Sequence, residues 1–223
     1  MTRLGEKIRE GSIWQRNVAE LLSSIGEGWI ASLDTWTYAS ATTITVPSGA
    51  GSKYAVGDKI RLVQTSTKYF VIVGVADSLL TITGGTDYTL ANATITDPYY
   101  SHAASPMGYP NRFAYTPTAT GFGGSPPTMT GLFSVIGRRC FVTILTSANG
   151  TSTGTGFTLT APIAASHAAF SGGNYGFDNG VLQEKIRASI AAAGTTITLL
   201  ADGAAAWTNV NAKGANVNLE YPI

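Results

Sequence analysis

Hydrophobic positions recur with a helical period near the start of the chain. Four apolar residues follow one another there at spacings of four, three and four: Trp14, Val18, Leu21 and Ile25. This spacing places them on one stripe of a helix. Ser12 and Gln15 match a capping box at its start, and Gly26 provides a stop. The sequence therefore predicts a short N-terminal helix.

The apolar stripe of this helix has two interpretations. It could contact other copies of the chain or another protein, or it could pack against the β-structure of its own chain. A stripe shorter than two heptads does not sustain a coiled coil alone, because three or four heptads are expected for that. We favour a docking or oligomerisation contact through Trp14, Val18, Leu21 and Ile25.

From Trp29 onward, short apolar or alternating runs bounded by turn residues replace the helical period. The strands expected in the first half are 35–38, 42–46, 59–64, 68–75 and 79–83. Those expected in the second half are 132–136, 139–145, 156–161, 185–190, 195–200 and 215–221. Asp178-Asn179-Gly180 has the composition of a tight hairpin turn. This spacing of strands and turns predicts an all-β chain of small barrels or sandwiches.

Prolines divide the chain. Six of the nine lie at positions 98, 106, 110, 117, 126 and 127, and proline cannot donate to a regular strand ladder. We therefore expect a helical docking segment at 1–27, a small β module at 28–104, a linker at 105–127 and a β-sandwich at 128–223.

Six aromatic residues crowd the proline-rich stretch: Tyr99, Tyr100, Tyr109, Phe113, Tyr115 and Phe122. We interpret them as anchors onto a β module or a neighbouring subunit, in preference to a sugar-binding platform.

The composition narrows the classes of function. Charged residues make up 12% of the 223 residues, the net charge is +1 and the mean hydropathy is +0.13. These values argue against a disordered chain, which needs low hydrophobicity and high net charge. They also argue against a nucleic-acid-binding protein, which needs clustered Lys and Arg. The longest apolar run, 69–76, is far shorter than the roughly 20 residues of a membrane span, and no signal-peptide pattern is present. Such a low content of charged residues favours an oligomer in which much of the surface is buried between subunits.

The sequence offers few candidate catalytic or metal-binding residues. Gly150-Thr151-Ser152-Thr153-Gly154 matches a nucleophile-elbow pattern, but an expected strand follows it, and His167 and Asp178 come in the wrong order for that fold. His102 and His167 lie far apart without paired cysteines, and Cys140 has the setting of a small buried residue. We expect no catalytic residues, no metal and no cofactor.

Several stretches resemble a known group of proteins. DTWTYASATTITVPSG (34–49), YAVGDKIRLVQTSTKYFVIVGV (54–75) and LLTITGGTDYTLANATITDPYYS (79–101) resemble a module of tailed-bacteriophage virion proteins. GRRCFVTI (137–144), TGFTLTAPIAA (155–165) and NLEYPI (218–223) are similar, more loosely, to phage appendage head domains. The resemblance implies a jelly-roll-like C-terminal domain that forms a homotrimer.

It also implies a structural, non-enzymatic part of a phage particle, in a tail, baseplate, fibre or head-attached appendage, in contact with other virion proteins. A long fibre is disfavoured, because collagen-like repeats and a heptad shaft are absent from the sequence. An alternative is a module that recognises host cell-surface glycan through loops such as 146–156 and 171–180. A remote alternative is a cell-surface hydrolase that depends on Ser152.

Overall fold

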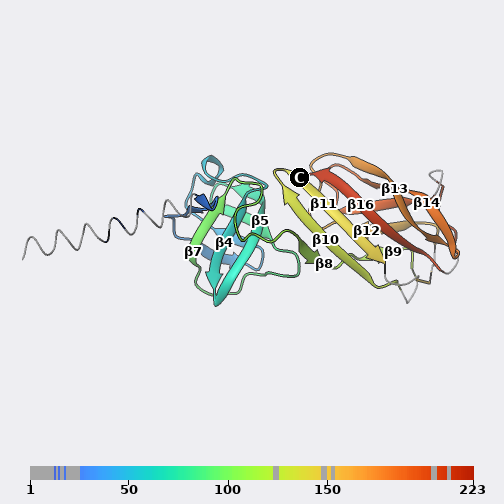
Figure 1. Cartoon of the computed structure of the whole chain (residues 1–223), viewed down its shortest axis with the longest axis horizontal. Coiled ribbons are helices and arrows are strands. Elements are labelled where there is room, and N and C mark those ends of the chain that lie inside the picture. Colours follow the sequence, from blue (N-terminus) through green and yellow to red (C-terminus); the bar gives the residue numbers. More distant parts are fainter. Residues whose placement is uncertain are drawn as a thin grey trace, which may run out of the picture. The chain divides into compact units, whose positions relative to one another are not determined.

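The computed structural model describes residues 13, 15 and 18 and the ranges 26–122, 126–146, 150–151, 154–201, 205–209 and 212–223. Within these residues the chain is all-β, which confirms the predicted class, and none of its helices reaches seven residues. No helix in the described part is long and apolar enough to cross a membrane. The chain divides into two compact units (Figure 1). Unit 1 comprises Met1–Thr81 and Leu90–Tyr109, and unit 2 comprises Ile82–Thr89 and Pro110–Ile223.

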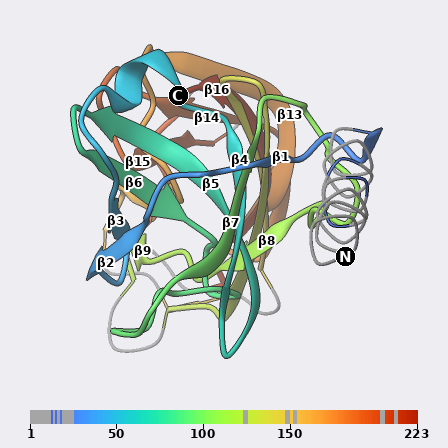
Figure 2. The same cartoon turned by 90° about the vertical axis from the view of Figure 1, so that its left-hand side faces the viewer.

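Unit 1 is built on a seven-stranded antiparallel sheet with the strand order β1-β7-β4-β5-β6-β3-β2. Figure 2 shows these strands in the colours of the first half of the chain. Their bounds are β1 Ile30–Ala31, β2 Thr37–Ser40, β3 Thr43–Thr45, β4 Lys59–Gln64, β5 Ser66–Ala76, β6 Leu79–Thr83 and β7 Thr96–Ser101. A short 3-10 helix, η1, spans Ala50–Ser52.

Alternation of buried and half-buried residues from Ile60 to Gln64 explains why β4 forms where the sequence predicts it. Ile60 and Leu62 are fully buried on one face of the sheet, and Ile60 pairs with Phe70 of β5. Arg61 lies between them on the opposite face. A one-residue connection, Thr65 at φ 65°, joins β4 to β5. The bounds of β4 and β6 match the predicted strands 59–64 and 79–83.

Unit 2 contains a nine-stranded antiparallel sheet with the order β8-β10-β11-β16-β13-β14-β15-β12-β9. The bounds are β8 Phe113–Tyr115, β9 Ala119–Thr120, β10 Met129–Ile136, β11 Arg139–Thr146, β12 Phe157–Thr160, β13 Ala169–Asp178, β14 Val181–Ile190, β15 Thr196–Leu200 and β16 Gly214–Pro222. β16 is shared along its length. Its residues 217–222 pair with β11, and its residues 214–216 pair with β13.

The connection between the two edge strands shows how far this sheet curls. β8 and β9 lie at opposite edges of the sheet, yet only residues 116–118 separate them in the chain. An extended chain rises at most about 3.6 Å per residue, so the four steps from Tyr115 to Ala119 span at most about 14 Å. The sheet therefore has to curl back on itself, and it forms a half-barrel.

The Pro- and Gly-rich stretch 105–127, for which we expected a linker, supplies both of these edge strands. Edge positions are where a sheet tolerates proline, because one side of the strand needs no ladder hydrogen bonds. Pro117 lies between β8 and β9, and each of these strands is three residues long or shorter. Short edge strands also limit unwanted pairing with other chains.

The hairpin between β13 and β14 confirms the predicted tight turn. Asn179 and Gly180 have φ angles of 54° and 71°, the left-handed conformations that a two-residue hairpin turn of this kind requires. β13 itself was not predicted. The sequence analysis placed a loop at 171–180, whereas eight of those ten residues, 171–178, belong to the strand.

Candidate functional site

The predicted docking stripe lies mostly outside the described residues. This applies to Trp14, Leu21 and Ile25. Val18 is helical and half-buried, and Ile13 is helical and 42% exposed. The docking role of the four residues stays a prediction.

The candidate hydrolase residues have local partners of their own. Ser152 lies outside the described residues. Asp178 accepts hydrogen bonds from the backbone N–H of Thr208 (2.9 Å) and from its hydroxyl (2.7 Å). His167 is exposed, and its Nδ1 lies 3.1 Å from the hydroxyl of Ser166. In the described part of the chain, no hydrogen bond joins His167 to Asp178.

The thiol and metal candidates have no reactive setting in the described residues. Cys140 is fully buried, and burial raises the pKa of its thiol to about 12, which keeps the thiol protonated at neutral pH. Among the described residues, no group of three or more His, Cys, Asp and Glu side chains could hold a metal ion.

The aromatic residues around the prolines act as anchors inside the two units. In unit 1, the rings of Tyr109 and Trp29 are 6.2 Å apart. In unit 2, the ring centroids of Phe113 and Phe133 are 5.6 Å apart. Those of Phe122 and Phe157 are 4.9 Å apart. Packing against a β module of the same chain is one of the two anchoring roles that the sequence indicated.

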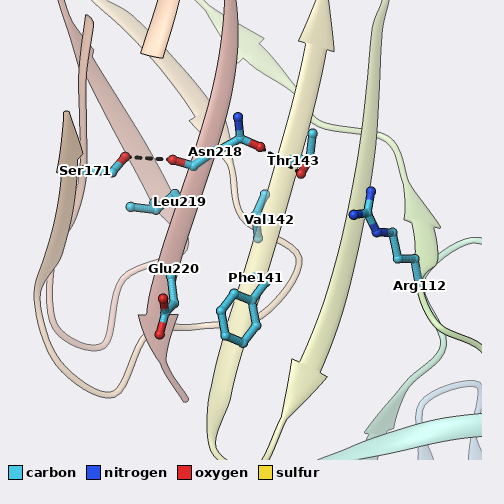
Figure 3. A pocket seen from close by; sticks show the side chains of 8 residues that line it. All are labelled: Arg112, Phe141, Val142, Thr143, Ser171, Asn218, Leu219 and Glu220. Atoms are coloured by element: carbon cyan, nitrogen blue, oxygen red, sulfur yellow. Dashed lines mark hydrogen bonds between the residues drawn. The ribbon is translucent and has the colours of Figure 1, made fainter. Parts of the chain in front are cut away.

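A hollow of about 350 Å³ opens on the outward face of the unit 2 sheet (Figure 3). Side chains and backbone of β11, β13 and β16, with Arg112 from the segment before β8, line it: Arg112, Phe141, Val142, Thr143, Ser171, Asn218, Leu219 and Glu220. Most of its polar residues already have a hydrogen-bond or ion-pair partner. Thr143 donates to the side-chain oxygen of Asn218 (2.9 Å), and Glu220 forms an ion pair with Arg139. Few groups are left for a ligand, so this hollow is a weak candidate for a binding site.

Ser171 and Asn218, which line this hollow, also form hydrogen bonds around a bulge in β13. The register of β13 against β14 shifts on both sides of Asn174, and Gly173 has φ 80°. Ladder bonds to β16 are replaced there by side chains. The backbone N–H of Asn218 donates to the Asn174 side chain (2.8 Å), and the hydroxyl of Ser171 donates to the Asn218 carbonyl (2.7 Å). The Asn174 amide in turn donates to Ser171 (3.0 Å).

Replacing Asn174 by alanine should therefore destabilise unit 2. Asn174 is only 3% exposed, and its loss leaves the half-buried backbone N–H of Asn218 without this acceptor. A polar group left unsatisfied in the interior costs about 1–3 kcal/mol, so we expect a loss of about 1–3 kcal/mol. Urea unfolding with hydrogen exchange at β16 measures this loss. His167→Ala, at an exposed position, is the control; equal stability of the two variants would contradict the role given to Asn174.

Large apolar side chains project outward from the β13–β14 hairpin, and we call them the hairpin patch: Phe170, Tyr175, Phe177 and Leu182. Their exposed fractions run from 37% for Phe177 to 72% for Phe170. Phe177 and Leu182 pair directly across the two strands.

The pattern of β13 is reversed compared with an ordinary half-buried strand. Asn174, Gly176 and Asp178 occupy its buried positions, whereas Tyr175 and Phe177 face outward. Gly176 is needed there, because a Cβ at this position would lie 2.2 Å from the carbonyl oxygen of Gly214. Exposed apolar side chains gathered on one hairpin mark an interaction site more often than scattered single residues do.

The outward face of β16 and β11, the next two strands after β13 in the sheet, extends the hairpin patch. Ile144 pairs with Val217, so Leu145 lies beside Asn216, which pairs with Tyr175. Leu145 is 48% exposed. The sequence analysis missed this surface because it depends on which face each residue of β13 occupies.

Comparison with known proteins gives no relative: no family model, no curated protein and no solved structure matches this chain.

Proposed function

We propose that this chain is a structural protein of a bacteriophage particle that assembles as a homotrimer through the hairpin patch. The observation that carries the proposal is the reversed pattern of β13, which exposes Tyr175 and Phe177 next to Leu182. The stretches 34–49, 54–75 and 79–101, which resemble a module of phage virion proteins, support the place of the chain in a tail, baseplate, fibre or head-attached appendage.

Other copies of the same chain are the partners that this surface suits best. Burial of apolar area contributes roughly 25 cal/mol per Å², so shielding these four large side chains favours association. β14 also carries exposed charges of both signs, Glu184, Lys185 and Arg187. Charges of both signs on one surface can pair between identical copies in a closed symmetric assembly. The net charge of +1 adds little overall repulsion between copies.

The jelly-roll-like character of unit 2 is part of this proposal. Buried side chains from β10 and β11, such as Phe133 and Val142, lie on the concave side of the curled sheet. So do those of β14 and β15, such as Ile186 and Ile197. The sharing of β16 between both halves supports a sandwich-like arrangement in which one strand passes from one half to the other. The N-terminal residues Trp14, Val18, Leu21 and Ile25 are the proposed contact with other virion proteins.

The molar mass in solution tests the assembly. Light scattering on the purified chain should give three copies of the 23.2 kDa protein. Phe177→Ser combined with Leu182→Ser should give a single copy, because both apolar side chains at the centre of the hairpin patch are lost. Leu33→Ser is the matched control, since Leu33 is 96% exposed in unit 1, and it should leave the trimer intact.

A wild-type chain that stays a single copy at high concentration would contradict assembly, and an intact trimer in the double variant would remove the hairpin patch as its interface. The virion role has its own test. An antibody against the chain should label phage particles at one fixed place in electron micrographs, and particles without the chain would contradict that role.

A further inference from the structure

We propose that a hollow across β7, β4 and β5 of unit 1 binds an uncharged saccharide. It has a volume of about 310 Å³, at the lower end of the roughly 300–1,000 Å³ typical of ligand pockets. Six residues line it: Arg61, Val63, Thr67, Tyr69, Asp97 and Tyr99. The inference concerns unit 1 and does not depend on the trimer proposed above.

Strand register places Arg61 between two tyrosines, and two aromatic rings contact its guanidinium group. Arg61 of β4 pairs with Tyr69 of β5 on one side and with Tyr99 of β7 on the other. The guanidinium carbon lies 4.3 Å from the centroid of the Tyr99 ring and 5.1 Å from that of Trp29. These cation–π contacts with two rings restrict the position of the guanidinium group, whose N–H groups remain hydrogen-bond donors.

A bulge brings a carboxylate to the same hollow. Two steps along β4, from Arg61 to Val63, face three steps along β7, from Tyr99 to Thr96. Asp97 lies in this bulge with φ 46°, a conformation that residues other than glycine seldom adopt. Bulges re-aim side chains and occur often beside functional sites. Asp97 is exposed and lines the hollow.

The two charged side chains keep their hydrogen-bonding capacity. Among the described residues, no side-chain hydrogen bond or ion pair engages Arg61 or Asp97, and the two do not pair with each other. An exposed aspartate elsewhere in the chain behaves differently: Asp87 accepts a bond from the backbone N–H of Ala114 (2.8 Å). The hollow therefore presents a fork of donors and a pair of acceptor oxygens beside aromatic surface.

This set of groups selects the class of ligand. A sugar ring offers hydroxyl groups that both donate and accept, and an apolar C–H face that packs against aromatic rings. A ligand with a net negative charge would be repelled by Asp97, and a ligand with a net positive charge would be repelled by Arg61. A neutral hexose satisfies both side chains at once, with the carboxylate accepting from a hydroxyl and the guanidinium donating to a sugar oxygen.

Titration of the full-length chain with a panel of methyl hexosides and neutral disaccharides tests the inference, by calorimetry and saturation-transfer NMR. We expect binding to at least one neutral sugar. Asp97→Gly removes the carboxylate and suits the positive φ; it should weaken binding about tenfold or more, as expected for a lost hydrogen bond to a charged group. Arg61→Lys keeps the charge, loses the planar fork and should weaken binding similarly.

Thr42→Ala, at an exposed position of unit 1 away from the lining residues, is the control and should bind as the wild type does. Thermal melting of each variant reports its folding, and Asp97→Gly keeps the test valid even if Arg61→Lys unfolds. Failure of every neutral sugar, binding of acidic or amino sugars alone, or undiminished binding in Asp97→Gly would overturn the inference. None of these results would bear on the oligomeric state.

Discussion

Replacing Trp29 by alanine is expected to lower the free energy of unfolding of unit 1 by about 3–5 kcal/mol, the usual cost of removing a large buried aromatic side chain. Trp29 is fully buried, and its indole N–H donates to the carbonyl of Met107 (2.8 Å). Its ring centroid lies 6.2 Å from that of Tyr69 and 5.1 Å from the guanidinium carbon of Arg61. The substitution therefore removes one of the two rings that orient Arg61 as well as the packing around it.

Hydrogen exchange at the amides of β4 and β7, together with urea unfolding, measures this loss. Leu33→Ala is the control, because Leu33 is 96% exposed and surface substitutions change stability by no more than about 0.5 kcal/mol. Trp29→Phe separates the two contributions, since it keeps most of the packing but loses the bond to Met107. If Trp29→Ala proves no more destabilising than Leu33→Ala, the packing described for Trp29 is wrong.

The strands that sequence reasoning locates well are those with a regular buried face. In β4, Ile60 and Leu62 alternate with more polar residues, and β6 repeats this pattern with Leu80 and Ile82. Such alternation is a local property, so it can be read without knowing the neighbouring strands.

β13 could not be found in this way, because its buried positions hold Asn174, Gly176 and Asp178. What stabilises Asn174 there is its bond to the backbone of Asn218. That contact joins residues far apart in the chain, and no local pattern reveals it. The edge strands β8 and β9 could not be found for a different reason: they are too short to show an alternating pattern.

The saccharide site depends on register for the same reason. Arg61 and Tyr99 become neighbours only because β4 pairs with β7. One sequence signal was present: Asp97-Pro98 interrupts an otherwise strand-like stretch, and a proline within a strand indicates an edge or a bulge. The sequence alone could not show which side chains surround Asp97.

Lys59 makes the stability of unit 1 depend on pH. Its side chain is fully buried, its ammonium group donates to the carbonyl of Gly57 (2.6 Å), and it lies 5.7 Å from the centroid of the Tyr109 ring. Burial lowers the pKa of Lys59 from 10.5 to about 8, although the neighbouring Asp58 acts in the opposite direction. The folded chain therefore releases this proton at a lower pH than the unfolded chain does.

The sign of the effect follows from proton binding. Below about pH 8 both states hold the proton, and the cost of the buried charge is fully present. Between about pH 8 and 10.5 the unfolded state binds more protons, so stability rises with pH by up to about 1.4 kcal/mol per pH unit. Cys140 opposes this at higher pH, because its raised pKa makes stability fall once the unfolded thiol ionises above about pH 9.

Comparison with Lys59→Met isolates the contribution of Lys59, since Cys140 titrates in both proteins. Replacing a buried charge by an apolar side chain of similar length is often neutral or stabilising. We expect the wild type to gain about 2 kcal/mol relative to Lys59→Met between about pH 7.5 and pH 9.5. Urea unfolding across this range measures the difference. Parallel curves for the two proteins would show that Lys59 keeps its ordinary pKa, and that its ammonium group is hydrated rather than buried against Tyr109.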